Sequence, residues 1–395
     1  MNPPRDARLL FLTRFVRLFA YGMLSVVLVF YLTGLGLSES QTGLLLTLTL
    51  AGDTAVSLVL TTQADRIGRR RMLVAGAFLM VGAGLAFALT RNFLLLVIAG
   101  TVGVISPSGN EVGPFLPIEQ AALSEVVSRE ARTSVFAWYQ LAGAFATAAG
   151  SLFGGFIAAE SSQRVVVMAY GTLGLVLAAI FGCVSGSVEV QSTVTDHKMR
   201  WSVPHVPPVV WRLAGLFSLD AFGGGFVVQS FSAYWFYLRF GLKPEALGGI
   251  FFGANLLAGI SALLASRLAA RIGLVRTMVF THLPSNILLI LVPLMPTVKL
   301  AIAVLLVRFS ISQMDVPTRQ SYIMAVVAPR QRSAAAGVTG VARTTGAAIA
   351  PLFAGLLFAH PDLINVPFFI AGSLKIVYDL LLYRAFVHHQ PAEET

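Results

Sequence analysis

Ionisable side chains inside long apolar stretches are the residues of this sequence that could do chemistry. A charged group at bilayer depth is energetically costly, so one found there indicates a functional site unless a partner neutralises it. Both signs of charge are present. The acids are Asp53, Glu111, Glu119, Asp220, Asp315 and Asp379, and the bases are Arg14, Arg17, Arg308, Arg319, Arg343 and Lys375.

Asp53 and Asp220 are the best candidates for binding a coupling proton, because they lie near the middle of the second and seventh apolar stretches. A carboxylate in a cavity of low dielectric constant binds and releases protons nearer neutral pH than one in water. Glu111 and Asp315 are further candidates of the same kind. The alternative is structural: a buried ion pair, or a hydrogen bond between two helices.

Helical spacing suggests which charges neutralise each other. Lys375 and Asp379 are four residues apart, which places them on one helix face, so we expect them to pair. Asp315 and Arg319 have the same spacing, and Arg308 lies two turns earlier. For this second group, a gate in a cavity wall and a structural network both remain open.

Substrate contacts are expected from arginines and from polar residues in the apolar stretches. Arg308 and Arg343 each require an anion or a buried carboxylate. Asn110 lies in a segment, 107–117, whose prolines and glycines rule out a straight helix. Either Asn110 lines the transport pathway, or the segment is a kink needed only for helix packing. The same two alternatives, substrate contact or packing, apply to Tyr21, Gln229 and Asn255.

Composition places these residues in a membrane protein. The chain has 395 residues, of which 56% are hydrophobic and 12% charged, against roughly 25% charged in soluble domains. We therefore expect an all-α integral membrane protein in a lipid bilayer. Stretches long enough to cross it are expected at 9–32, 42–62, 72–90, 93–123, 133–158, 164–186, 209–238, 246–266, 277–296, 299–327, 333–358 and 366–386.

The net charge of +10 comes from arginines and lysines in short loops, which fits the positive-inside rule better than binding to nucleic acid. With both termini in the cytoplasm, the outer loops hold only Arg91, Arg164, Arg239, Lys243 and Lys299. We therefore expect a multi-pass protein of the inner or plasma membrane with both ends cytoplasmic.

Internal repeats divide the twelve expected helices into two pseudo-symmetric bundles of six. Residues 64–72, after the second stretch, resemble residues 269–278, after the eighth. Further residues recur at a nearly equal spacing, with Pro117, Gln120 and Arg132 matching Pro317, Gln320 and Arg332. We expect an N-terminal bundle at 1–186, a cytoplasmic linker at 187–208 and a C-terminal bundle at 209–395. Two homologous halves suit a transporter that rocks about a central site.

The loop Asp65-Arg66-Ile67-Gly68-Arg69-Arg70 resembles the signature loop of the major facilitator superfamily. The resemblance covers essentially the whole chain and implies a central cavity with alternating access. It also implies that the loop is a gating latch, rather than a topology signal alone. In that reading Asp65 accepts hydrogen bonds from a neighbouring helix N-terminus and Gly68 permits the turn. Arg66 and Arg69 pair with an acid such as Glu125.

Residues 143–155 resemble the glycine-rich antiporter motif of the drug exporters in that family, except that Ser151 stands where the motif has proline. Pro351, in the eleventh stretch, is the matching proline. The arginine that the family often has in helix 4 is absent around Ser108, and Arg308 is its nearest counterpart.

Three functions are compatible with these features. The first is proton-coupled efflux of small amphipathic or weakly charged molecules by a monomer without a cofactor. The second is proton-coupled transport of a small organic or inorganic anion, supported by Arg308, Arg343 and the arginines of the first helix. A membrane enzyme or channel is the third, and it is disfavoured because the sequence has no phosphate-binding loop and no metal-binding histidine pattern.

Overall fold

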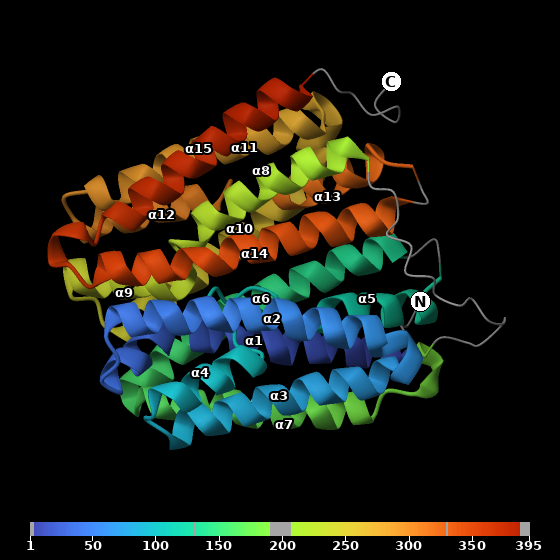
Figure 1. Ribbon diagram of the computed structural model, residues 1–395, viewed down its shortest axis with the longest axis horizontal. Coiled ribbons are helices and arrows are strands. Elements are labelled where there is room, and N and C mark those ends of the chain that lie inside the picture. Colours follow the sequence, from blue (N-terminus) through green and yellow to red (C-terminus); the bar gives the residue numbers. More distant parts are fainter. Residues whose placement is uncertain (1–3, 129–131, 190–206, 329–330, 388–395) are drawn as a thin grey trace. The chain divides into compact units, whose positions relative to one another are not determined.

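The computed structural model describes residues 4–128, 132–189, 207–328 and 331–387, and over these residues it contains helices and no strand (Figure 1). Short 3-10 helices occur at Gly186–Val188, Val292–Leu294 and Pro361–Leu363. The α-helices are α1 (Arg5–Gly34), α2 (Glu39–Ile67), α3 (Arg69–Leu89), α4 (Phe93–Val102), α5 (Phe115–Val126), α6 (Arg132–Glu160), α7 (Gln163–Gly182), α8 (Pro208–Gly225), α9 (Gln229–Phe240), α10 (Pro244–Ile272), α11 (Leu274–Leu291), α12 (Val298–Phe309), α13 (Asp315–Ala325), α14 (Arg332–Phe358) and α15 (Val366–Phe386).

These helices form the twelve membrane-crossing segments expected from the sequence. Ten segments in the described residues are helices long and apolar enough to cross a membrane, with α8 and α9 counted together as one. The fourth and tenth expected stretches are each broken into two shorter helices, α4 with α5 and α12 with α13. The protein is therefore a multi-pass membrane protein of twelve segments.

The break in the fourth segment follows directly from its sequence. Gly109 and Gly113 have φ angles of +69° and +81°, a backbone conformation that side chains with a Cβ rarely adopt. The predicted interruption at 107–117 is confirmed. The other two breaks were not predicted: one follows the three glycines at 223–225, and the other precedes Pro317, which sits in the first turn of α13 where a missing N–H is tolerated.

The chain divides into two compact units. Unit 1 comprises Met1–Ser192 and Val228–Leu256, and unit 2 comprises Thr193–Val227 and Leu257–Thr395. Residues 228–256, expected in the second half, thus pack with the first. Two contacts within unit 1 hold them: Tyr234 donates to Glu39 at 2.8 Å, and Ser230 N–H donates to the Pro107 carbonyl at 3.1 Å. Most of the expected linker, 190–206, lies outside the described residues.

The same helix pairings recur in the two units. In unit 1, α1 packs along α6 and α3 along α7; in unit 2, α8 packs along α14 and α11 along α15. Counted as membrane-crossing segments, the first packs along the fifth and the third along the sixth in unit 1. The equivalent segments of unit 2, the seventh with the eleventh and the ninth with the twelfth, pack in the same way. This recurrence agrees with the repeats found in the sequence.

The glycine-rich stretch of α6 brings its backbone against α1. A Cβ placed on Gly150 would lie 2.0 Å from the carbonyl oxygen of Phe19, and one on Gly154 would lie 2.3 Å from that of Met23. Only glycine therefore permits this approach, as is usual where membrane helices pack closely.

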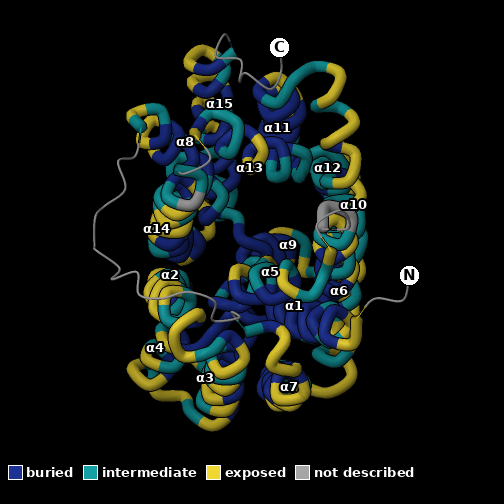
Figure 2. Tube along the Cα trace, turned by 90° about the vertical axis from the view of Figure 1, so that its right-hand side faces the viewer, coloured by how far each residue is buried: buried dark blue, intermediate teal, exposed yellow. Residues whose placement is uncertain are grey.

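The outward faces of the bundles are apolar. Phe78, Leu85 and Leu89 on α3 and Leu94 on α4 are each more than half exposed, and exposed residues follow α3 and α7 in Figure 2. Large apolar side chains on an outer surface are expected where a helix faces lipid instead of water.

Candidate functional site

A network of two arginines and two glutamates lies at the centre of unit 1. Arg17 on α1 forms a bidentate pair with Glu119 on α5, with nitrogen–oxygen distances of 2.8 and 2.7 Å. Glu111, in the broken segment, accepts from Arg17 Nε at 2.9 Å and from Arg14 at 2.8 Å. The four charges balance.

Further polar side chains complete this network. Thr13 donates to Glu119 at 2.7 Å, Tyr139 also bonds to Glu119, and Gln140 accepts from Arg14. The arginines of the first helix, predicted as possible anion ligands, therefore already have carboxylate partners. Glu111 is ion-paired as well, and its predicted role in binding a proton stays a prediction.

Asp53 differs from the other acids of unit 1. It lies on α2, is 8% exposed, and its Oδ1 atom is buried without a hydrogen-bond partner. Within the described residues no arginine, lysine or histidine forms an ion pair with it. Burial disfavours the charged form of a carboxylate that has no cation beside it, and the role of Asp53 in binding a proton stays a prediction.

Asp220 on α8 is the hub of a second network, inside unit 2. Lys375 Nζ on α15 lies 2.5 Å from Asp220 Oδ1, and Arg319 on α13 lies 3.3 Å from Oδ2. Arg319 also bonds to Asp315 at 2.8 Å, four residues earlier on the same helix.

The predicted pair of Lys375 with Asp379 is wrong. Asp379 instead accepts from Asn286 at 2.9 Å and lies 2.8 Å from Nδ1 of His282, both on α11. Because α15 packs against both α8 and α11, its two charged residues each have a partner on a different helix. A pair of Lys375 with Asp379 within α15 would leave Asp220 without its lysine.

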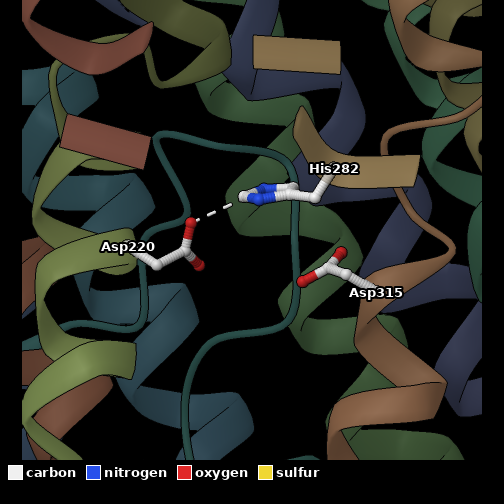
Figure 3. Close-up of side chains that lie close together, drawn as sticks. All are labelled: Asp220, His282 and Asp315. Carbon is white, nitrogen blue, oxygen red and sulfur yellow. Dashed lines mark ion pairs between the residues drawn. The ribbon is translucent and has the colours of Figure 1, made fainter. Parts of the chain in front are cut away.

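His282 lies between Asp220 and Asp379, and it was not among the residues predicted from the sequence. Its Nε2 atom lies 3.6 Å from Asp220 Oδ1, and Figure 3 shows the ring directed at that carboxylate with Asp315 nearby. The signal was available, because His282 is the histidine that lies well inside an apolar stretch.

Asp220, His282 and Asp315 also bring three possible metal-ligand atoms within 4.8 Å of one another. The residues do not fit a divalent cation, however. Lys375 and Arg319 already bond to the two carboxylates, and a metal ion would have to displace both of these fixed cations.

Arg308 and Arg343 are also in unit 2, and each has a buried Nε atom without a hydrogen-bond partner. The structure gives neither guanidinium an ion pair with a described residue. Arg308 lies over the ring of Phe309, 5.0 Å from its centroid. These two arginines therefore keep the unsatisfied donors that an anionic group would bind.

Gln229 and Asn255, predicted as substrate contacts, meet in unit 1. Gln229 donates to Ser25 at 2.8 Å and to Ser151 at 3.1 Å, while Asn255 donates to Gln229 at 3.0 Å. Ser151 occupies the position where the exporter motif has proline, and its hydroxyl accepts from both amides.

The other two predicted contacts are not brought to this polar group. Tyr21 is fully buried against Tyr170, which agrees with the packing alternative, whereas Asn110 is exposed.

Comparison with known proteins identifies the family. The model of the Major Facilitator Superfamily matches residues 10–342. The chain belongs to this superfamily. It is a transporter and not an enzyme.

Three similar proteins show how far the sequence and the fold of this chain resemble those of known transporters and membrane proteins. The uncharacterized membrane protein YJR124C of Saccharomyces cerevisiae is 30% identical, over 97% of this chain and 94% of its own. The quinolone resistance protein NorA of Staphylococcus aureus is 26% identical over 54% of this chain and 55% of its own. A mutant of the nucleoside transporter NupG shares the fold with a TM-score of 0.80 at 10% identity, over 97% of this chain and 100% of that one.

The signature loop of this superfamily member has the expected turn but different bonds. Gly68 has a φ angle of +118°, as a tight turn requires. Asp65 pairs with Arg69 at 2.8 Å instead of accepting from a neighbouring helix N-terminus, so that prediction is wrong. Arg69, and not Arg66, reaches Glu125, at 3.5 Å. Arg70 donates to the Val184 carbonyl at 3.2 Å.

Glu189 performs the capping that was expected of Asp65. Its carboxylate accepts from the backbone N–H of Arg69 at 2.7 Å and of Arg70 at 3.1 Å, the first two residues of α3. The helix dipole adds to this attraction. No sequence signal identified Glu189, because it lies far along the chain from the helix that it caps.

Replacing Glu189 by glutamine is expected to lower the free energy of unfolding by about 1 kcal/mol, since a neutral amide caps a helix less strongly than a carboxylate. Thermal unfolding in detergent, followed by tryptophan fluorescence, measures the change. The exposed Glu160, at the end of α6, gives the matched control Glu160→Gln. Equal unfolding temperatures for the two variants would show that the Glu189 cap contributes nothing.

Proposed function

We propose that this protein is a proton-coupled secondary transporter that exports small amphipathic or weakly charged molecules. The observation that carries the proposal is Asp53, a buried carboxylate inside a membrane-crossing helix with an unpartnered oxygen and no cation paired to it in the described residues. Such a group is a candidate for binding the coupling proton, and its change of charge can bias the two states of a transporter.

Export as the direction rests on two similarities. The glycine-rich stretch of α6 resembles the antiporter motif and packs closely on α1, and NorA, whose name describes resistance to quinolones, is similar over about half of this chain. We further propose a monomer in the inner or plasma membrane with both termini in the cytoplasm, supported by the placement of the basic residues.

The test uses purified protein in liposomes with an acidic interior and an internal pH-sensitive dye. Organic cations, neutral amphipathic molecules and organic anions are added in turn. We expect cations or neutral amphipathic molecules to trigger proton movement in the wild type. Asp53→Asn is expected to abolish that movement while keeping exchange of labelled for unlabelled substrate, which needs no proton.

The matched control is Asp362→Asn, a change of the same type at an exposed residue of the 3-10 helix Pro361–Leu363. Proton movement should be unchanged in this variant. If Asp53→Asn retains substrate-linked proton movement at the wild-type rate, Asp53 is not the coupling residue. If no compound moves protons through the wild type, the proposal of proton coupling fails.

A second candidate function, transport of a small anion, is favoured by Arg308 and Arg343 and their unpartnered Nε atoms. Under this alternative only the anions trigger proton movement, and Arg343→Gln abolishes it. Under export of cations and neutral amphipathic molecules, Arg343→Gln leaves substrate-linked proton movement in place.

A further inference from the structure

Four polar side chains meet inside unit 1, and each comes from a different helix. Ser25 on α1 and Ser151 on α6 lie against Gln229 on α9 and Asn255 on α10. The amide of Gln229 donates to Ser25 at 2.8 Å and to Ser151 at 3.1 Å. The amide of Asn255 donates to Ser151 at 3.2 Å and to Gln229 Oε1 at 3.0 Å. We call these four residues the amide–hydroxyl cluster.

The Ser151 hydroxyl is the acceptor that both amides share. A hydroxyl has one donor hydrogen and two acceptor lone pairs. Its hydrogen has carbonyl acceptors beside it, Thr147 at 3.0 Å and Gly22 at 3.3 Å. Both lone pairs are therefore left for Gln229 and Asn255. Removing the hydroxyl takes one hydrogen-bond acceptor from each amide, at a position that is 0% exposed.

The backbones of α6 and α10 touch beside this hydroxyl. A Cβ placed on Gly155 would lie 2.8 Å from the Cα atom of Gly248, and one on Gly248 would lie 2.8 Å from the Ser151 carbonyl oxygen. Small residues allow such an approach, and hydrogen bonds between polar side chains add to the association of membrane helices. The amide–hydroxyl cluster thus provides the side-chain bonds at a contact made by glycines.

The helix α10 carries Asn255 up to the boundary between the two units. Residues up to Leu256 belong to unit 1 and those from Leu257 to unit 2, yet α10 is one helix from Pro244 to Ile272 with its proline at the first position. A helix without an internal proline lacks the commonest cause of a sharp bend. A movement of unit 2 is therefore passed along α10 to Asn255, and it acts on the bond to Ser151.

The second repeat shows that helix packing does not require the hydroxyl. Pro351 on α14 is the counterpart of Ser151, and α14 packs along α8 as α6 packs along α1. The exporter motif also has proline at this position. A proline side chain cannot accept a hydrogen bond, so the bonds to Gln229 and Asn255 are a feature of this chain and not of the packing.

We infer that Ser151 is a gating residue of the transport cycle. Its hydroxyl holds the amides of Gln229 and Asn255 in the state in which α9 and α10 lie against α1 and α6, and it releases them when the cycle separates these helices. This role rests on the proposed two-state transporter, but it involves no proton and is independent of Asp53.

The experiment measures the separation of α6 from α10 in the purified full-length protein without substrate. The single cysteine, Cys183, is replaced by serine. Spin labels are attached to cysteines at two exposed positions, Glu160 at the end of α6 and Glu245 in the first turn of α10. Electron paramagnetic resonance gives the distribution of distances between the labels. We expect Ser151→Ala to raise the ratio of separated to closed molecules about 3- to 10-fold, as the loss of two hydrogen bonds between membrane helices predicts.

Two further variants separate the hydrogen bonds from other effects of the change. Ser266→Ala is the matched control, because this exposed hydroxyl of α10 bonds to the Leu263 carbonyl of its own helix, and it should leave the distances unchanged. The double variant Gln229→Leu, Asn255→Leu removes both donors and should favour the separated state at least as much as Ser151→Ala. Adding Ser151→Ala to that double variant should have no further effect.

Wild-type distances in Ser151→Ala would overturn the gating role. So would a further shift when Ser151→Ala is added to the double variant, because Ser151 would then act through packing and not through the two amides. The measurement uses neither substrate nor a proton gradient. It therefore decides the role of Ser151 even if the wild type moves no protons, and a failed gate leaves the proposed proton coupling at Asp53 untouched.

Discussion

Replacing Glu119 by alanine is expected to destabilise the folded protein by about 3–5 kcal/mol, the cost of leaving a buried charge without its partner. Glu119 is fully buried and receives two bonds from Arg17, one from Thr13 and one from Tyr139. Its loss leaves Arg17 with Glu111 alone. We expect little folded protein after purification, measured as the monodisperse fraction in size-exclusion chromatography and as the thermal unfolding temperature.

The double variant Arg17→Met, Glu119→Met separates charge from packing. It removes one charge of each sign and leaves Arg14 bonded to Glu111 at 2.8 Å, so no buried charge is left over. Replacing a buried ion pair by apolar side chains of similar volume is often neutral for stability. We therefore expect the double variant to be much more stable than Glu119→Ala. If both are equally unstable, the network acts through its shape and hydrogen bonds instead of its charge balance.

The twelve segments could be predicted because each is a long apolar run in the sequence. Their division into two halves could be predicted because the loops of the first half recur in the second. The seventh and tenth segments show where this reasoning ends. Their breaks depend on the glycines at 223–225 and on the position of Pro317 in a helix start, features that are also compatible with a continuous helix. The grouping of residues 228–256 with unit 1 depends on contacts between distant segments, which no local pattern records.

The candidate site was predictable as a set of charged residues but not as a set of partners. Helical spacing placed Asp315 and Arg319 on one face, and the two do pair, because one helix contains both. The same rule failed for Lys375 and Asp379, because each pairs with a residue of another helix. Lys375 contacts Asp220 on α8, and Asp379 contacts His282 on α11. Glu189 illustrates the same limit, because its target lies at the start of α3, more than a hundred residues earlier.

Replacing Asp220 by alanine is the second change with a large expected effect. The ammonium group of Lys375 loses the carboxylate that it contacts at 2.5 Å, whereas Arg319 keeps Asp315. An uncompensated buried lysine again costs about 3–5 kcal/mol. We expect a marked drop in the thermal unfolding temperature and no transport driven by a pH gradient.

The double variant Asp220→Ala, Lys375→Met distinguishes a structural ion pair from a functional one. It removes both charges of the pair, so stability should recover toward that of the wild type. Gradient-driven transport should stay lost, because Asp220, a candidate proton-coupling residue, is absent. Recovery of stability together with gradient-driven transport would mean that Asp220 and Lys375 only hold α8 to α15. Recovery of stability alone assigns the pair to the coupling step, since the fold then survives without the two charges while gradient-driven transport does not.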